Sequence, residues 1–312
     1  MCSPNWQLIA HACASISTPI ATAYDTLGET GLTHSLNEPS CIGVFTNAEL
    51  LPTVLKVLPK TPSIKYVVYD GDARQPLLDN IRNIHDINVF SISELRELGR
   101  TKPLEPLEAR RPKPDYVACI MYTSGSTGIG DPIGVCMTHH NLVASVGAVY
   151  TLLGHHWAYD DSYLAYLPLA HVFEYIVELI MLFVGIPSGY GRVKTLMDAS
   201  VRGCEGDMNA FRPSIMVGIP AIWETMHKGI LASVNSSGTV KRFLFHGAIA
   251  AKKNSTPILS QLADAAVLRG FRAATGGRLR IALCGGAAIS RETQEFLNVA
   301  LVTLVQGTLF SP

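Results

Sequence analysis

The feature that most constrains the fold is an apolar segment that runs directly into a loop of glycine, serine and threonine. Val117-Ala-Cys-Ile-Met121 is wholly apolar and predicts a buried strand. From Thr123 to Gly128 the chain reads Thr-Ser-Gly-Ser-Thr-Gly, which places four hydroxyl groups and two glycines in one tight turn. Successive backbone N–H groups of such a turn can converge on an anion, so the sequence predicts a phosphate-binding loop at the end of a strand.

Strands and helices alternate along the chain. Cys41–Thr46 reads as a strand followed by a helix from Asn47, and Ile87–Phe90 leads into a helix that Ser91 caps and Glu94 closes as a capping box. Further apolar runs that read as strands are Tyr66–Tyr69, Ser162–Tyr166, Ser214–Gly218 and Leu279–Cys284. This alternation predicts an α/β protein with largely parallel, doubly wound sheets, in which ligands collect beyond the carboxyl ends of the strands.

Three segments are predicted to be helical from their caps and apolar spacing. Thr138 can cap a helix that continues to about Leu153, where Gly154 stops it. Trp223–Gly229 looks helical and is expected to end on its glycine. Ile176–Ile186 is the longest apolar stretch, and it reads as a buried helix because it is too short to span a membrane.

The chain is expected to form two α/β subdomains, residues 1–160 and residues 161–312. Arg100–Pro114 carries four prolines and five basic side chains, which predicts an exposed connector within the first subdomain. No internal repeat and no low-complexity tract is visible in the sequence.

Composition narrows the class of partner. With 48% hydrophobic and 16% charged residues, the 312-residue chain is expected to fold around a core. The formal net charge is zero and no run of Lys or Arg exceeds two residues, so a nucleic-acid partner is not expected. The seven cysteines are scattered singly, which indicates reduced thiols in an intracellular protein and no metal site. The first residues form neither a basic leader nor an apolar signal core, so secretion is not expected.

The string Tyr122–Gly128 resembles the first phosphate loop of the adenylate-forming, AMP-binding superfamily. Other parts of the chain resemble the long-chain fatty acyl-CoA synthetase branch of that superfamily. They are Ala23–Glu29, Tyr166–Glu174, Pro213–Glu224, Lys228–Gly229, Leu283–Ala287, Ile289–Glu292 and Gln294–Phe296. The resemblance spans nearly the whole chain, and it implies the large N-terminal domain of such an enzyme, incomplete and without the C-terminal lid domain.

This resemblance implies a reaction and a set of binding residues. ATP and a long-chain fatty acid would form an acyl-adenylate with release of pyrophosphate, and CoA would then displace AMP to give a thioester; Mg²⁺ would accompany ATP. The residues implied to bind the nucleotide are Thr123, Ser124, Gly125, Ser126, Thr127, Gly128, Gly285, Gly286, Ala287, Gln306 and Gly307. His171 would lie at the mouth of the acyl site. No residue of this chain is given a catalytic or metal-binding role.

Several of these residues also have a purely structural reading. His171 can be a hydrogen-bonded histidine at a strand end, although its surrounding string favours a site position. Glu174 can face the site or pair with a surface cation, and both readings stay open. Gly285-Gly286 can be an ordinary turn. Trp223 is expected to anchor the core.

The chain departs from the family pattern just after the phosphate loop. Where the family reads one residue and then Pro-Lys-Gly-Val, this chain reads Ile129-Gly-Asp-Pro-Ile-Gly-Val135. Two residues are added, and an apolar side chain, Ile133, replaces the ammonium group near the phosphates. Asp131 adds a negative charge beside a polyanion, so nucleotide binding is expected to be weakened.

The ends of the chain also differ from the family. Gln306-Gly307 begins a segment that the family continues as Tyr-Gly-x-Thr-Glu, whereas this chain reads Thr308-Leu-Phe-Ser-Pro312. Pro312 cannot replace a magnesium-binding carboxylate. By resemblance, the family's ribose-binding aspartate, hinge and mobile C-terminal domain would lie beyond the last residue, and part of its large domain would precede the first.

Three alternative functions are considered for this chain. The first is a long-chain fatty acid:CoA ligase. The second is a catalytically inactive fragment that keeps only part of the nucleotide- and acyl-binding surface, and this chain alone is expected to be inactive. The third, an unrelated nucleotide hydrolase, would need the Gly-Lys-Ser/Thr of its phosphate loop, which is missing here.

Family analogy indicates an intracellular location. The expected places are the cytosol or the cytosolic face of the endoplasmic reticulum, peroxisome or lipid droplet. No transmembrane segment, anchor or C-terminal peroxisomal tripeptide is visible, and peripheral membrane association stays open.

Overall fold

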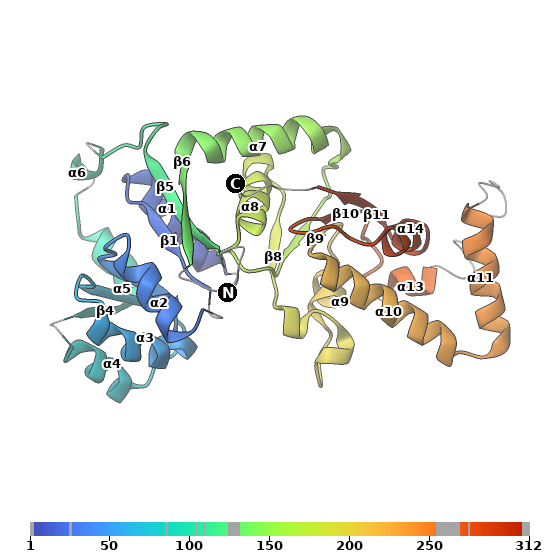
Figure 1. Cartoon of the computed structure of the whole chain (residues 1–312), viewed down its shortest axis with the longest axis horizontal. Helices are drawn as coiled ribbons and strands as arrows, with labels where there is room; N and C mark the ends of the chain where they lie inside the picture. The colour runs from blue at the N-terminus through green and yellow to red at the C-terminus, as the bar shows by residue number, and fades with distance from the viewer. Residues whose placement is uncertain are drawn as a thin grey trace. The chain divides into compact units, whose positions relative to one another are not determined.

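The computed structural model divides into two compact units (Figure 1). It describes residues 3–24, 27–84, 87–103, 105–108, 110–123, 132–253, 269–273 and 275–307. The first unit contains Ser3–Ala148 and Pro168–Val172, and the second contains Val149–Leu167 and Phe173–Pro312. The predicted subdomain division at residue 160 stays a prediction.

One sheet of the first unit has the order β1-β5-β6. Its central strand β5 (Val117–Thr123) pairs in parallel with β1 (Ile20–Thr22) and antiparallel with β6 (Ile133–Thr138). Cys119 and Tyr122 in β5 are almost completely buried, which agrees with the wholly apolar run in the sequence. The predicted strand is therefore confirmed and is two residues longer than expected.

The other sheet of the first unit is parallel, in the order β2-β3-β4. Its strands are β2 (Gly43–Asn47), β3 (Tyr66–Asp70) and β4 (Asn88–Ser91), and the helices α3 (Leu51–Val57), α4 (Gln75–Arg82) and α5 (Ile92–Arg100) follow them in turn. Leu51, Leu58, Val67 and Ile81 form the fully buried centre of their common core. At the start of α5, Ser91 and Glu94 form the predicted capping box.

Further helices occur among the described residues of this part of the chain. They are α1 (Pro4–Ser15), α2 (Gly28–Asn37), α6 (Glu105–Glu108) and α7 (His139–Leu153), the last of which continues across the boundary between the units. The Thr138 hydroxyl accepts a hydrogen bond from the Asn141 backbone N–H at 3.2 Å, which confirms the predicted cap of α7. The described side chains of the predicted connector are all exposed, including those at the end of the short α6.

The second unit is built on a five-stranded sheet with the order β11-β10-β9-β7-β8. Its strands are β7 (Tyr163–Ala165), β8 (Ser188–Tyr190), β9 (Ile215–Gly218), β10 (Ile281–Cys284) and β11 (Thr303–Gln306), and all their pairings are parallel. The strand predictions around Tyr163, Ile215 and Ile281 are confirmed. The α/β class with largely parallel sheets is confirmed as well.

The described helices of the second unit are α8 (Val172–Val184), α9 (Asp207–Phe211), α10 (Pro220–Ser236), α11 (Thr239–Lys253), α13 (Arg269–Ala273) and α14 (Arg291–Ala300). The prediction that a helix ends at Gly229 is wrong, because α10 runs on to Ser236. The extra turns place Val234 against Phe245 of α11, and burial of these side chains outweighs the low helix propensity of one exposed glycine. Within the described residues, no helix combines the length and the apolar character needed to cross a membrane.

Candidate functional site

The predicted phosphate loop begins where β5 ends. Thr123 is the last residue of β5, whereas Ser124, Gly125, Ser126, Thr127 and Gly128 lie outside the described residues. The preceding Tyr122 is fixed in place, since its hydroxyl donates a hydrogen bond to a Glu38 carboxyl oxygen at 2.5 Å. Burial, together with the Glu38 carboxyl group, raises the pKa of Tyr122. The loop therefore starts from a rigid strand end.

His171 belongs to the same unit as this strand end. The hydroxyl of Thr22, the last residue of β1, donates a hydrogen bond to the Ala170 carbonyl at 3.2 Å. Because β1 pairs with β5 in parallel, this bond holds the turn at His171 near the carboxyl edge from which the loop departs. His171 is half-buried, and desolvation lowers its pKa, which favours the neutral imidazole.

The other predicted nucleotide-binding residues meet at one edge of the second unit's sheet. Cys284 of β10 pairs with Gln306 of β11, and the Gly307 N–H donates to the Cys284 carbonyl at 2.9 Å. Gly285, Gly286 and Ala287 follow β10 directly. The structure thus brings all five residues together at the carboxyl ends of parallel strands, the edge at which ligands of such sheets bind.

Glycine is required for two different reasons at this edge. A Cβ atom on Gly285 would lie 2.7 Å from the Phe173 ring, so the backbone here is packed directly under an aromatic side chain. Gly286 has a φ of +81°, a left-handed conformation that side-chain-bearing residues rarely adopt. Gly285 is therefore buried against Phe173, whereas the exposed Gly286 presents bare backbone.

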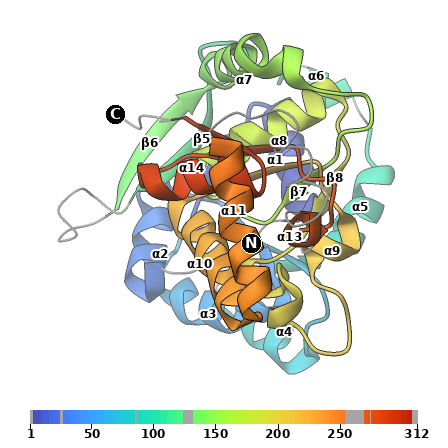
Figure 2. The ribbon, with the colours of Figure 1, turned by 90° about the vertical axis from the view of Figure 1, so that its right-hand side faces the viewer.

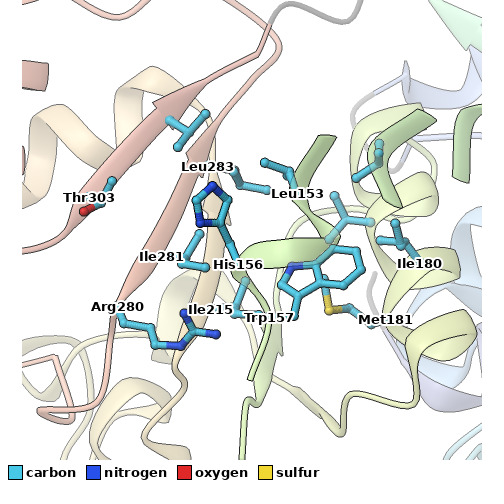
Figure 3. A pocket seen from close by; sticks show the side chains of 13 residues that line it. Leu153, His156, Trp157, Ile180, Met181, Ile215, Arg280, Ile281, Leu283 and Thr303 are labelled. Atoms are coloured by element: carbon cyan, nitrogen blue, oxygen red, sulfur yellow. The ribbon is translucent and has the colours of Figure 1, made fainter. Parts of the chain in front are cut away.

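An apolar cavity of about 250 Å³ lies in the second unit on one face of the sheet (Figure 3). The strands contribute Ile281 and Leu283 of β10 together with Thr303 and Val305 of β11. Across from them lie side chains of the end of α7, of the segment after it and of α8, namely Val149, Leu153, His156, Trp157, Val177, Ile180 and Met181. The cavity follows the strands from Arg280 at the amino end toward Leu283, two residues before Gly285.

An ion pair between the exposed Arg280 and the buried Asp161 lies at the amino end of this cavity. Arg280 Nε donates to Asp161 Oδ1 at 2.7 Å, and a second Arg280 nitrogen contacts the other carboxyl oxygen. Burial alone would raise the pKa of Asp161, but the hydrogen bonds from Arg280, the Ala158 N–H and Ser214 hold it below its usual value. Arg280 is thereby held in a fixed position at the cavity wall.

Sequence reasoning did not find the cavity. Its strand residues alternate at positions 281 and 283 and at positions 303 and 305, which is the period of one sheet face. That spacing could have indicated a shared wall. It could not have shown that this wall faces empty space, because the opposing helices determine that.

The structure places Glu174 in the interior of the second unit. Glu174 is fully buried, and its carboxyl group accepts a hydrogen bond from the Tyr163 hydroxyl. Trp223 is fully buried, as predicted for a core anchor. No group of three or more His, Cys, Asp or Glu side chains suited to a metal ion occurs among the residues that the structure describes.

Solved structures with a similar fold are adenylate-forming domains. The adenylation domain of a carboxylate reductase from Mycobacterium chelonae matches with a TM-score of 0.70 and 18% identity, over 99% of this chain and 46% of that chain. A long-chain-fatty-acid-CoA ligase from Archaeoglobus fulgidus matches with a TM-score of 0.62 and 15% identity, over 99% and 50%. The fold is therefore that of the large domain of adenylate-forming enzymes.

The family model described as AMP-binding enzyme matches residues 2–308, and the chain belongs to this family. Long-chain-fatty-acid–CoA ligase 2 of Schizosaccharomyces pombe is 39% identical over 310 residues, covering 98% of this chain and 44% of that protein. Long-chain-fatty-acid–CoA ligase 4 of Saccharomyces cerevisiae is 39% identical over 322 residues, covering 98% and 46%. The chain thus spans less than half the length of these relatives.

Proposed function

We propose that this chain carries the ATP- and acyl-binding part of a long-chain fatty acid:CoA ligase. The observation that carries the proposal is the 39% identity to a protein named as such a ligase, sustained over 98% of the chain. The reaction would join a fatty acid to AMP with release of pyrophosphate, and CoA would then take the acyl group as a thioester. The protein's part is to orient the carboxylate toward the α-phosphorus and to stabilise phosphate charge.

The phosphates would be held by the loop that leaves β5. Thr123, Ser124, Ser126 and Thr127 would donate hydroxyl hydrogen bonds, and Gly125 and Gly128 would donate from the backbone. Tyr122 supports this proposal because its bond to Glu38 gives the loop a fixed starting point. Mg²⁺ belongs to the proposal as the counterion that travels with ATP phosphates.

The adenylate and the acyl chain would meet at the carboxyl edge of the second unit's sheet. The exposed backbone at Gly286, with Ala287, Gln306 and Gly307 following the same pair of strands, could be approached closely by a flat or acyl group. The apolar cavity begins two residues earlier in the strand, at Leu283. An acyl chain would lie along the sheet in this cavity with its carboxylate toward Gly285.

His171, in the first unit, is proposed to contact the acyl substrate because its surrounding string, Tyr166–Glu174, resembles the long-chain branch of the family. A neutral imidazole can donate one hydrogen bond and accept another without placing a cation beside an apolar chain. In the proposed reaction, CoA is the acceptor of the acyl group. The proposed location is intracellular, in the cytosol or at the cytosolic face of the endoplasmic reticulum, peroxisome or lipid droplet, with peripheral membrane contact.

One observation favours the second candidate, an inactive fragment with weakened nucleotide binding. Ile133, at the start of β6 and paired with Thr123, is 60% exposed, and the family pattern described above has an ammonium group at this position. An apolar side chain there contributes nothing to phosphate binding. The two candidates differ in whether the adenylate binds at all.

The test is titration calorimetry with non-hydrolysable sulfamoyl analogues of palmitoyl-adenylate and acetyl-adenylate. Under the ligase proposal the palmitoyl analogue binds at least about 100-fold more tightly, because each buried methylene contributes about 0.8 kcal/mol. Equal affinities would remove the acyl cavity from the proposal. If neither analogue binds at millimolar concentration, the chain is the inactive fragment.

A further inference from the structure

The cavity in the second unit has different chemistry at its two ends. Near the carboxyl end of the strands, its wall is formed by Leu283 of β10 and Val305 of β11, which are register partners. Toward the amino end, the wall is formed by Thr303, the first residue of β11, and by Arg280, which precedes β10. A hydroxyl group and a guanidinium group therefore line the end of the cavity that is remote from Gly285.

This cavity lies on the face of the sheet that α8 covers. Figures 1 and 2 show α8 on one face of the second unit's sheet and α10 and α14 on the other. Across from the strands, the cavity is also lined by His156, which ends the short helical segment after α7 (Figure 3). Arg280, Thr303 and His156 are all exposed, so water reaches the amino end of the cavity.

The polar groups at this end keep hydrogen-bonding capacity for a ligand. Among the residues that the structure describes, no protein group hydrogen-bonds to the Thr303 hydroxyl or to the His156 ring. Arg280 uses Nε and one terminal nitrogen on Asp161, which leaves its other terminal nitrogen available. A hydroxyl and an imidazole can donate and accept, whereas a guanidinium only donates. Together these side chains can satisfy one small group that is both a donor and an acceptor.

The charge at this end favours a neutral polar group over an anion. Asp161 is almost fully buried, and its carboxyl group pairs with Arg280, so the guanidinium charge is already balanced. A carboxylate placed here would lose part of its hydration without gaining an unpaired cation. A hydroxyl group carries no charge and matches the donors and acceptors that are present.

We propose that the cavity binds ω-hydroxy fatty acids in preference to unsubstituted ones, with the terminal hydroxyl at Arg280, Thr303 and His156 and the carboxylate toward Gly285. From Gly285 to Arg280 the strand direction advances about 16 Å, which an extended acyl chain of roughly a dozen carbons spans. The inference rests on the proposed function, because it assigns the substrate class of the same acyl cavity.

The test is titration calorimetry of the chain with laurate and ω-hydroxylaurate. The hydroxy acid should bind about three- to tenfold more tightly, because its hydroxyl gains hydrogen bonds at the amino end. The isomer with its hydroxyl at mid-chain is the matched control ligand, and it should bind at least about tenfold more weakly than laurate because that hydroxyl would meet apolar walls. Dodecanedioate should bind more weakly than ω-hydroxylaurate. Leu283→Glu should abolish binding of both laurate and ω-hydroxylaurate, which locates the ligands in the cavity.

A double variant tests the polar end itself. Thr303→Val combined with His156→Leu should reverse the preference, so that laurate binds more tightly than ω-hydroxylaurate. The matched control combines Thr225→Val on α10 with His246→Leu on α11, since both residues are exposed and neither lines the cavity. This control should keep the preference of the parent. All four substituted side chains are exposed, so the fold should tolerate both double variants, and circular dichroism checks this.

The possible failures separate this inference from the proposed function. If the parent binds laurate at least as tightly as ω-hydroxylaurate, the inference is wrong and the acyl cavity still stands. The same conclusion follows if dodecanedioate binds most tightly, or if the variant at Thr303 and His156 keeps the preference of the parent. If none of these acids binds, both the inference and the proposed acyl cavity fail.

Discussion

The Tyr163 hydroxyl of β7 lies 2.9 Å from both carboxyl oxygens of Glu174 on α8. Both residues are fully buried, so this contact ties the helix that covers the sheet to the sheet itself. One turn further along α8, Glu178 accepts a similar bond from Tyr190 of β8 at 3.0 Å. The tyrosines let an otherwise apolar helix carry two buried acids.

Tyr163→Phe should therefore destabilise the protein by about 1–3 kcal/mol, because it removes a donor from a buried carboxyl group. Tyr190→Phe is the matched comparison, since Tyr190 is only half-buried and water can replace its hydroxyl. Urea unfolding followed by circular dichroism measures both. A loss for Tyr163→Phe no larger than that for Tyr190→Phe would show that the Glu174 contact is not the stronger tie.

Gly285→Ala should lower the free energy of unfolding by about 1–3 kcal/mol, because the added methyl group would overlap the Phe173 ring. Phe173→Leu should restore part of that loss, which a double-mutant cycle would detect as coupling. Gly229→Ala is the control: it lies in the interior of α10 with open space around it, and it should stabilise by about 0.5–1 kcal/mol. Additive effects of the changes at 285 and 173 would contradict the packing described.

Stability should decrease as the pH falls below about 6.5, partly through His227. His227 lies 3.0 Å from Thr293 and stacks on Phe296, and burial lowers its pKa against the opposing effect of Glu292 and Glu224. Below the unfolded pKa of 6.5 the unfolded chain binds the proton more tightly than the folded chain, so acidification favours unfolding.

His227→Gln should flatten this dependence, because an amide can keep the contact with Thr293 without titrating. Unfolding free energies at pH about 7.5 and about 5.5 give the slope. The exposed His246→Gln serves as the control and should leave the slope unchanged. An unchanged slope in His227→Gln would assign the acid sensitivity to other groups.

Ile133→Lys should raise the affinity for ATP about three- to tenfold, by returning an ammonium group to the edge of the phosphate loop. The site tolerates the change, since Ile133 is 60% exposed. Leu98→Lys is the control, because Leu98 is also exposed and lies on α5, beside the other sheet of the first unit, so it should leave ATP affinity unaltered. Titration of both variants with a fluorescent nucleotide measures the two affinities. Equal gains would mean that added charge alone, and not its position, was responsible.

Much of the fold could be predicted because local signals and tertiary structure agree. The buried run at Val117, the capping box at Ser91 and the cap at Thr138 each depend on a few neighbouring residues, and each is confirmed. The end of α10 was missed because the contact between Val234 and Phe245, not the exposed Gly229, determines it. A local sequence pattern cannot predict that α10 packs against α11.

The candidate site divides in the same way. Gly285 and Gln306 were each predicted from motif strings to bind the nucleotide, which stays a prediction, and the structure places them at the carboxyl ends of the paired strands β10 and β11. The burial of Glu174 and the cavity beside Leu283 were not predicted, because both depend on how α8 packs on the sheet. A short motif can predict which backbone segment is a candidate for binding a ligand. The walls of a cavity come from side chains that are distant in sequence, so a short motif cannot predict them.

The central claim, that a long acyl chain binds in the cavity of the second unit, is tested most directly by photo-crosslinking with a diazirine-bearing palmitate and mass spectrometry of the labelled peptides. The account predicts label on the α8 segment around Ile180 and on the β10 segment around Leu283, with both lost in Leu283→Glu, which places a carboxylate in the cavity. Val193→Glu, at an exposed position away from the cavity, should label like the parent. Label confined to other segments, or unchanged by Leu283→Glu, would contradict it.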